Sequence, residues 1–171
     1  MTAPEATPAW LGLGANLGDA VTTLGWALEQ LHTRPGLQVQ RISSLYRSAP
    51  IDASGPDYVN AVAQVATTLA PQALLEALQA LEQAAGRERP YRNAPRTLDL
   101  DILWFGKQHI STNTLTVPHP RIYERAFVLL PLVELVPERI SAAQLQRVQD
   151  QRIERIEHAR WRVPSGGAER G

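Results

Sequence analysis

Residues 95–102 read Pro-Arg-Thr-Leu-Asp-Leu-Asp-Ile, and Leu-Trp-Phe follows at 103–105. Apolar and acidic residues alternate here, which is typical of a β-strand because successive side chains point to opposite faces of a sheet. We therefore expect Asp99 and Asp101 to share one face of a strand. The opposite face is expected to carry Leu98, Leu100, Ile102 and Trp104.

Two carboxylates on one face of a strand lie about 7 Å apart, and they repel each other unless a cation or an arginine lies between them. Mg²⁺ prefers hard oxygen ligands and commonly takes one or two carboxylates together with waters and substrate phosphates. Asp99 and Asp101 therefore fit a magnesium site. Two solvated acids on an exposed sheet face would show the same spacing, so the surrounding sequence must decide.

Four arginines and one acid occur in residues 87–96, directly before this strand. The prolines of this segment exclude a regular helix, and we expect a loop that stays mobile until an anion binds. Arginine suits phosphate because its planar guanidinium can donate two parallel hydrogen bonds. A carboxylate pair beside such a loop is typical of phosphoryl transfer, where metal ions and guanidinium groups neutralise the transferring group. A basic surface loop without a ligand is the alternative.

The composition predicts one domain with a sizeable core, since the chain has 171 residues of which 44% are hydrophobic. We expect this domain over residues 10–163, with a flexible N-terminus at 1–9 and a disordered tail at 164–171. Lysine plus arginine and aspartate plus glutamate both number 17, so no net charge favours nucleic acid or a membrane surface. The chain has no cysteine, which excludes a disulfide framework and a zinc–thiolate site.

No apolar run is long enough to cross a bilayer. Residues 1–8 have neither the basic nor the apolar region of a signal peptide. We therefore expect a cytoplasmic protein with no membrane partner.

Hydrophobic periodicity predicts the order βαββαβ, the ferredoxin-like arrangement of an α+β fold. Its antiparallel sheet would carry helices on one face, with helical additions at the C-terminus. The expected strands are 10–14, 37–47, 58–68 and 98–105, and the expected helices are 20–33, 71–85, 125–136 and 141–163. Asp19 is a good N-cap, Pro71 suits a first helical turn, and Gly86 is expected just after the second helix.

Three glycines, Gly12, Gly14 and Gly18, approach the pattern of a dinucleotide-binding loop. The third glycine is one residue late, and no acid ends a second strand about 20 residues further on. A dinucleotide-dependent oxidoreductase is therefore disfavoured.

Six short motifs follow one another along residues 10–137. They are Gly14-Ala-Asn-Leu-Gly18, Ser43-Ser-Leu-Tyr-Arg47, Pro56-Asp-Tyr-Val-Asn60, Gly86-Arg87, Pro95-Arg-Thr-Leu-Asp-Leu-Asp-Ile102 and Val117-Pro-His-Pro-Arg121. Together they resemble the motifs of the 6-hydroxymethyl-7,8-dihydropterin pyrophosphokinases, also called 2-amino-4-hydroxy-6-hydroxymethyldihydropteridine diphosphokinases. The runs 95–101 and 117–120 carry the resemblance most specifically.

The resemblance implies an ATP-dependent diphosphotransferase of folate biosynthesis. Such an enzyme moves the β,γ-pyrophosphoryl group of ATP to the hydroxymethyl group of the pterin and releases AMP and the pterin diphosphate. Asp99 and Asp101 would hold two Mg²⁺ ions, and Arg87 and Arg96 would stabilise the charge of the transferring group. The expected partners are therefore ATP and a reduced pterin, and we expect a monomer.

The resemblance also implies further contacts to both substrates. Those to ATP would come from Gln79, Glu82, Arg87, Arg89, Arg92, Arg96, Ile102, Thr116, His119 and Arg125. Those to the pterin would come from Asn16, Ser48, Ala49, Ile51, Tyr58, Asn60 and Phe127, with Ser48 and Ile51 acting through their backbones. Tyr58 and Phe127 would flank the ring while Asn60 reads its edge, which is what a flat, hydrogen-bonding heterocycle needs.

Some positions depart from the family pattern. Ala15 stands where serine is common, Ser48-Ala49 where some members have Thr-Pro, and Asn93 where certain members have tryptophan. These departures concern loop dynamics and substrate affinity rather than the reaction. The segment beyond about residue 140 matches no motif; it could contact a partner or cover the sheet edge, and we expect the latter.

A non-catalytic ferredoxin-like module that binds a nucleotide or metal as a regulatory signal is the alternative, since the same fold hosts many functions. Such a module would bind ATP without releasing AMP. It leaves the combined occurrence of Tyr58, Asn60 and Phe127 unexplained, so the pyrophosphokinase is preferred.

Overall fold

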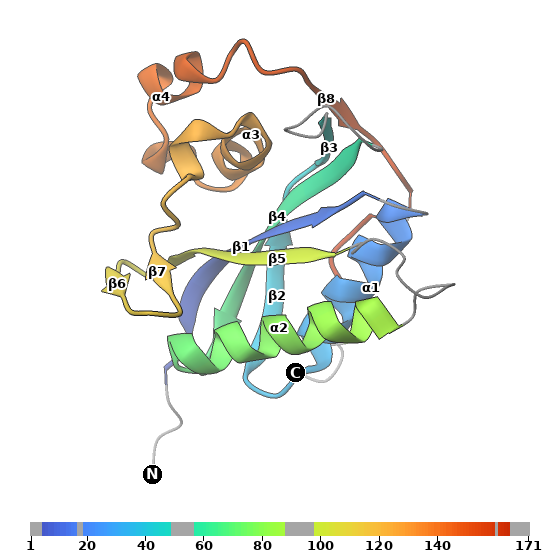
Figure 1. The fold of residues 1–171 in the computed structure, drawn as a ribbon, viewed down its shortest axis with the longest axis vertical. Helices are drawn as coiled ribbons and strands as arrows, with labels where there is room; N and C mark the ends of the chain where they lie inside the picture. The colour runs from blue at the N-terminus through green and yellow to red at the C-terminus, as the bar shows by residue number, and fades with distance from the viewer. Residues whose placement is uncertain (1–4, 17–18, 49–56, 88–97, 160, 165–171) are drawn as a thin grey trace.

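The computed structural model describes residues 5–16, 19–48, 57–87, 98–159 and 161–164. Its first part contains β1 (Thr7–Ala15), α1 (Ala20–Thr33), β2 (Leu37–Ile42), β3 (Leu45–Ser48), β4 (Tyr58–Thr67), α2 (Pro71–Arg87) and β5 (Asp99–Phe105). The predicted βαββαβ order is confirmed, with the second expected strand divided into β2 and β3 (Figure 1).

Short elements follow β5. They are β6 (Ile110–Ser111), β7 (Thr116–Val117), the 3₁₀-helix η1 (Ile122–Glu124), α3 (Ala126–Leu135), the 3₁₀-helix η2 (Pro137–Arg139), α4 (Ala142–Arg147) and β8 (Ile153–Ile156). The main sheet has the strand order β5-β1-β4-β3-β8, with β2 also paired to β4, and all of its pairings are antiparallel. The predicted α+β, ferredoxin-like fold is therefore confirmed.

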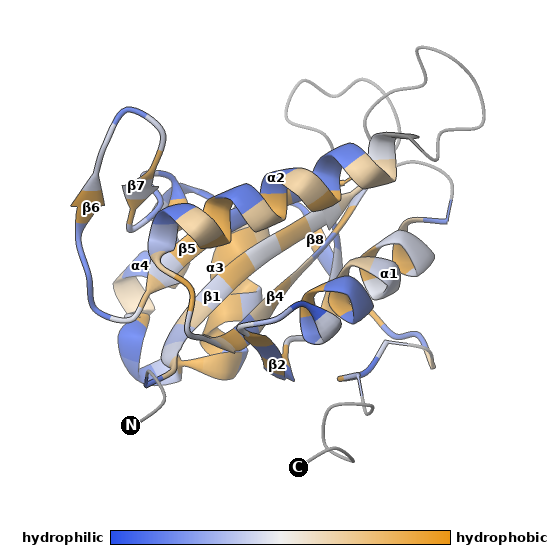
Figure 2. Cartoon of the chain, turned by 90° about the horizontal axis from the view of Figure 1, so that it is seen from below, coloured by the Kyte–Doolittle hydropathy of each residue, from blue (hydrophilic) through white to orange (hydrophobic). Residues whose placement is uncertain are grey.

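Helices α1 and α2 cover one face of the sheet, and α3 covers the other (Figure 1). The first core, here called the helix-side core, contains alternate residues of the strands together with the apolar stripes of α1 and α2. Figure 2 shows both helices with hydrophobic and hydrophilic sides, as amphipathic helices require. Asp19 caps α1 as predicted, because its Oδ1 accepts from Thr22 N at 3.1 Å, and Pro71 is the first residue of α2. Gly86 was expected after α2, but the helix continues through it to Arg87.

The second core lies beneath α3 and is here called the α3-side core. Trp10 and Trp104 meet edge to face in it, with ring centroids 5.7 Å apart. The Arg139 guanidinium lies 3.8 Å from the centroid of the Trp104 ring, a cation–π contact at the border of this core.

Strand β5 departs from the predicted alternation after Ile102. Trp10 pairs with Trp104 while Leu11 pairs with Ile102, so the register shifts and Leu103 is the extra residue of a β-bulge. The bulge turns Trp104 into the α3-side core, opposite to the prediction, and Phe105 into the helix-side core. Asp99 and Asp101 precede the bulge and lie on the predicted face, because Leu98, Leu100 and Ile102 fill the helix-side core.

The helix expected over 141–163 is wrong. Among the described residues of this segment α4 alone is helical, and residues 153–156 form β8, which pairs with β3. Ile153 and Ile156 have a spacing that also fits a helix, but β3 would otherwise leave its outer backbone groups unpaired. The expectation that this segment covers the sheet edge is confirmed. At the other end, β1 begins at Thr7, so residues 7–9 belong to the sheet and not to a flexible N-terminus.

After β8 the chain crosses to the helix side of the sheet. Trp161 and Val163 pack against the helix-side core, and Pro164, expected in the disordered tail, is buried. Trp161 Nε1 donates to the carbonyl oxygen of Ser43 at 2.7 Å. Ser43 lies where β2 and β3 separate, and its Oγ accepts from Val62 N at 2.9 Å in place of a regular ladder bond.

We predict that Trp161→Phe lowers the free energy of unfolding by about 1–2 kcal/mol, because it leaves the Ser43 carbonyl without its indole donor while keeping a packed ring. Urea denaturation would measure the loss. Trp26→Phe is the matched control, since Trp26 is also half-buried against the helix-side core and the described residues give its indole no hydrogen-bond partner. Equal losses in both variants would show that the indole–carbonyl bond contributes nothing.

Candidate active site

The predicted polar residues lie in register across the α3 side of the sheet. Asp99 of β5 pairs with Gly14 of β1, and Gly14 pairs with Asn60 of β4. In the adjacent row, Asp101 pairs with Gly12. Neighbouring strands are about 4.8 Å apart, so the backbones of Asp99 and Asn60 are separated by about 10 Å across β1.

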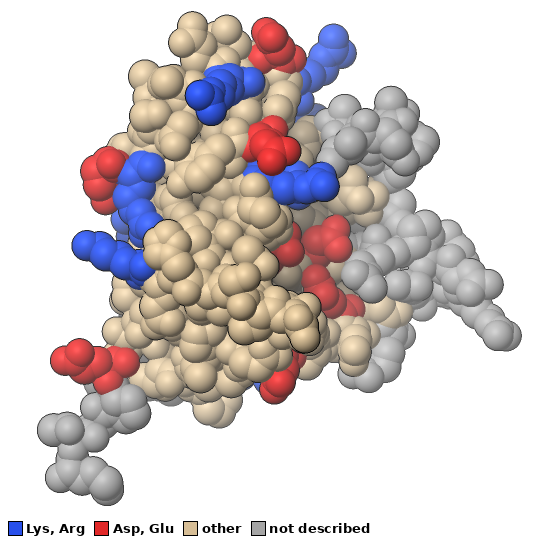
Figure 3. Space-filling view, turned by 60° about the vertical axis from the view of Figure 1, so that its left-hand side comes forward, with Lys and Arg blue, Asp and Glu red and all other residues tan. Residues whose placement is uncertain are grey.

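Strand β1 therefore places no side chain between the acids and Asn60. Gly12 and Gly14 form a strip without side chains of its own, here called the glycine floor, on the face that carries the polar residues. Leu103 borders it at Gly12, and Asn60 borders it at Gly14. Asp99 and Asp101 are both exposed at its border. Figure 3 shows acidic side chains gathered near the middle of one face of the molecule, with basic side chains above them. A flat or extended ligand could lie on this floor and reach both sides.

On the other side of the floor, β4 carries Tyr58 and Asn60 on the same face, as predicted. Asn60 is buried, and its Oδ1 accepts from Ser48 Oγ at 2.9 Å. Tyr58 is half-buried at the start of β4. Phe127 is half-buried in the first turn of α3, with the Arg125 guanidinium 5.4 Å from its ring centroid. Two aromatic rings and a buried amide thus come from the sheet and from the helix that covers this face.

Asn16, at the end of β1, has a buried Oδ1 to which no described residue donates a hydrogen bond. Buried carbonyl oxygens in proteins almost always accept a hydrogen bond. A donor from a ligand or a water would therefore stabilise this side chain.

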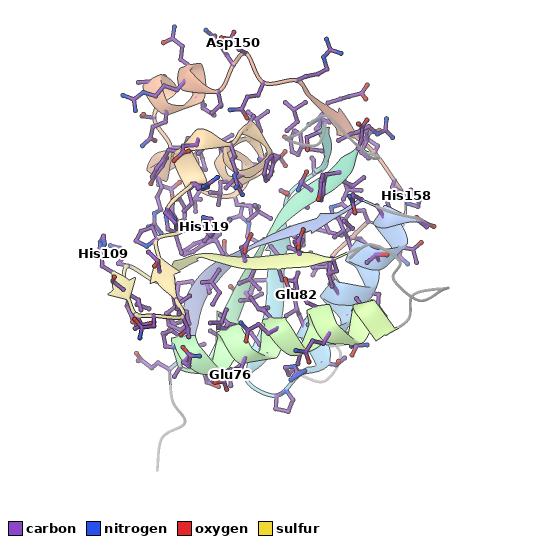
Figure 4. All side chains as sticks on the ribbon, in the orientation of Figure 1. Glu76, Glu82, His109, His119, Asp150 and His158 are labelled. Atoms are coloured by element: carbon purple, nitrogen blue, oxygen red, sulfur yellow. The ribbon has the colours of Figure 1, made fainter. Side chains whose placement is uncertain are left out.

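His119 is held near the acids by its backbone. Its N–H donates to Leu103 O at 3.0 Å, and its Nδ1 accepts from Arg121 N at 3.2 Å, so the imidazole proton lies on Nε2. Burial lowers the pKa of His119 below its usual value; the Asp101 carboxylate opposes this shift, while the guanidiniums of Arg125 and Arg121 add to it. A neutral imidazole at pH 7 whose Nε2–H has no acceptor among the described residues can donate to an anion. Figure 4 places His119 beside β5.

Glu82 reaches from α2 to the free edge of β5 (Figure 4). Its Oε2 accepts from Leu100 N at 2.8 Å, directly between the two aspartates in the sequence. Glu82 therefore secures the strand that carries both carboxylates. This contact depends on how α2 packs on β5, so no local pattern in the sequence signals it.

The other predicted ATP contacts are distributed unevenly. Gln79 is exposed on α2, one turn before Glu82, and Thr116 is exposed on β7. The side chain of Ile102 fills the helix-side core, so only its backbone can contact a ligand. Arg87 ends α2. The predicted residues that lie outside the described part of the chain are Ala49, Ile51, Arg89, Arg92 and Arg96.

Sequence reasoning missed the contact that holds α3 on the sheet. Tyr46 OH donates to the Glu134 carboxylate, whose Oε1 also accepts from Ser44 N at 2.8 Å. Burial and then this hydrogen bond raise the pKa of Tyr46 well above its usual value of about 10. Glu134 lies far along the chain from β3, so only the motif 43–47 marked this region as special.

The donor set fits magnesium better than a metal held by protein alone. Among the described residues no three histidine, cysteine, aspartate or glutamate side chains converge on one point. Two exposed carboxylates are what Mg²⁺ requires when phosphate oxygens and waters complete its octahedron.

Among the described residues, no helix has the length and hydrophobicity needed to cross a membrane.

We predict that Glu82→Ala accelerates hydrogen exchange at the Leu100 amide and lowers the free energy of unfolding by about 1–3 kcal/mol, because a partly buried N–H loses its acceptor. Glu82→Gln keeps an acceptor and should preserve most of the protection. Exchange measured by NMR would test this, with Glu76→Ala as the control, since Glu76 is exposed on the same helix. Unchanged Leu100 protection in Glu82→Ala would contradict the prediction.

The chain was compared with known proteins. The family model 7,8-dihydro-6-hydroxymethylpterin-pyrophosphokinase matches residues 10–137. The 2-amino-4-hydroxy-6-hydroxymethyldihydropteridine pyrophosphokinase of Bacillus subtilis is 38% identical over 159 residues, which cover 92% of each chain. The enzyme of the same name from Pseudomonas aeruginosa is 45% identical over 130 residues, covering 75% of this chain and 80% of the relative.

Solved structures agree with the fold. Wild-type HPPK-DHPS of Plasmodium falciparum, crystallised with pterin and p-hydroxybenzoate, superimposes with a TM-score of 0.64 at 16% identity. The match covers 81% of this chain and 41% of that one, so the chain spans less than half of the solved protein. The chain belongs to the 7,8-dihydro-6-hydroxymethylpterin-pyrophosphokinase family.

Proposed function

We propose that Asp99 and Asp101 hold the two Mg²⁺ ions with which this family member transfers pyrophosphate from ATP to 6-hydroxymethyl-7,8-dihydropterin in folate biosynthesis. The observation that carries the proposal is the exposed carboxylate pair at one border of the glycine floor, with Asn60 at the other. When bound, the metal would neutralise phosphate charge and orient the reacting oxygens.

The pterin side of the floor would be formed by Tyr58, Asn60 and Phe127. The two rings suit the faces of a flat heterocycle, and the buried amide suits its hydrogen-bonding edge. The Oδ1 of Asn16, which no described residue bonds, supports a ligand N–H just after β1. Ser48, Ala49 and Ile51 would add contacts from the loop that follows β3. In this arrangement the acceptor hydroxymethyl group points across β1 toward the acids.

The ATP side would lie along β5 and its free edge. His119 would donate its Nε2–H to a phosphate oxygen, with Arg125 nearby. Gln79 and Glu82 would lie toward the nucleoside. Thr116 and the backbone of Ile102 would complete this side. The arginines of the preceding loop would neutralise the phosphates: Arg87, Arg89, Arg92 and Arg96. Arg87 and Arg96 would act most strongly on the transferring group.

Chemistry at this site would consist mainly of positioning and charge stabilisation. The residues would bring the pterin hydroxyl and the β-phosphorus of ATP together across the glycine floor, which would make the attack effectively intramolecular. A loose phosphoryl transition state needs little help from a general base. We further propose that the enzyme acts as a single-domain monomer in the cytoplasm.

AMP formation from ATP tests the reaction. We expect AMP only when both 6-hydroxymethyl-7,8-dihydropterin and Mg²⁺ are present, because the hydroxyl attacks the β-phosphorus and AMP leaves. ADP would mean γ-phosphoryl transfer and a misassigned site. Tight ATP binding with no turnover would instead support the regulatory module.

Asp99→Asn and Asp101→Asn are each expected to lower kcat by at least about 100-fold, since the amide removes a charge that metal binding requires. Both side chains are exposed, so each variant should retain the fold. Steady-state kinetics with Mg²⁺ titration, together with urea denaturation, would separate the two effects. Full activity in either variant would remove that residue from the metal site.

Arg96→Ala should lower kcat more than it weakens ATP binding, because a guanidinium that acts on the transferring group contributes mostly in the transition state. Comparison of kcat with the Kd for a non-hydrolysable ATP analogue measures this difference. A raised Kd at constant kcat would assign Arg96 to ground-state binding instead.

A further inference from the structure

The amide of Asn60 is held from both sides of its strand. Strand β4 pairs with β3 along one edge and with β1 along the other. Asn60 is only 7% exposed, so its amide cannot exchange freely with solvent partners. An asparagine amide can turn by half a rotation and exchange its donor and acceptor ends, and a side chain that reads a ligand must be fixed in one of these states.

Ser48 fixes the oxygen end. Its Oγ, on β3, donates to Asn60 Oδ1 at 2.9 Å, and Ser48 itself is 7% exposed. A buried hydrogen bond of this kind holds the amide in place, and in the structure the hydroxyl is the donor and Oδ1 is the acceptor. The family resemblance assigns Ser48 a backbone contact to the pterin, whereas this contact uses its hydroxyl.

Gly14 lies next to the nitrogen end of the Asn60 amide. A Cβ built on Gly14 would lie 2.9 Å from Asn60 Nδ2, closer than Cβ atoms approach other heavy atoms. The amide nitrogen therefore packs against the β1 backbone, in space that any other residue would occupy. Gly12 lies on the same face of the same strand, but a Cβ there would only make ordinary contacts of 3.5 Å or more with Leu103.

We propose that Ser48 and Gly14 are positioning residues that turn the NH₂ group of Asn60 toward the glycine floor. The oxygen end faces β3 and the nitrogen end faces β1, so a heterocycle on the floor meets a hydrogen-bond donor. Asn60 then selects a ligand edge that presents an acceptor, a ring nitrogen or a carbonyl oxygen. This inference rests on the proposed function, because it concerns recognition of the pterin.

The test compares wild type with Ser48→Ala and Ser48→Thr. Ser48→Ala should raise the KM for the pterin about tenfold, the effect of one lost hydrogen bond of about 1.4 kcal/mol, with little change in the KM for ATP. Ser48→Thr keeps the hydroxyl and should restore the wild-type value. A structural role alone would lower stability without separating the two KM values, so urea denaturation accompanies the kinetics.

Pterin analogues give a second readout. Each edge nitrogen or carbonyl is replaced by C–H in turn, and the analogue that loses most affinity for wild type identifies the acceptor read by Asn60. Ser48→Ala should lose this discrimination about tenfold, and Gly14→Ala, which displaces the amide nitrogen, should lose it too. Gly12→Ala adds the same methyl group beside the acids and should keep the wild-type discrimination whatever it does to kcat.

The outcomes distinguish the proposed function from the positioning role of Ser48 and Gly14. Wild type that forms no AMP would refute the proposed function. Active wild type, with pterin KM and analogue discrimination unchanged in Ser48→Ala and Gly14→Ala, would refute the positioning role and leave the pyrophosphokinase reaction standing.

Discussion

The pairing of β1 between β5 and β4 is the constraint on which the rest of the site depends. The two faces of this strand differ in what they carry. Its inward side chains fill the helix-side core, while its outward positions Gly12 and Gly14 carry nothing. The acids and Asn60 lie on different strands and far apart in the sequence. They lie on either side of β1, on the same face of the sheet, because β1 sets the register of both neighbouring strands. A side chain at Gly14 would displace the Asn60 amide, and one at Gly12 would lie against Leu103.

Local patterns predicted much of this arrangement. The alternation around Asp99 and Asp101 is a property of one strand, so it could be read directly, as could the shared face of Tyr58 and Asn60. The N-cap of α1 and the start of α2 are equally local. Strand alternation already suggested a magnesium site at Asp99 and Asp101, whereas the roles of Tyr58 and Asn60 came from the family motifs.

The remainder depends on which segments pack together, and no spacing in the sequence contains that information. The bulge at Leu103 results from the register with β1, and β8 forms because β3 has a free edge to pair. The contacts of Glu82 with Leu100 and of Ser48 with Asn60 each join residues from different elements. Helix periodicity misread the β8 segment because two isoleucines three residues apart fit either structure.

The bulge divides β5 into a half that presents acids and a half that is buried on both faces. Trp104 and Phe105 fill different cores. The number of residues between Asp101 and each ring determines which face of the sheet that ring occupies. Exchanges between apolar residues in this segment alter side-chain volume, whereas a one-residue deletion or insertion would exchange the cores of both rings. Natural variation along 102–105 should therefore change residue type far more readily than chain length.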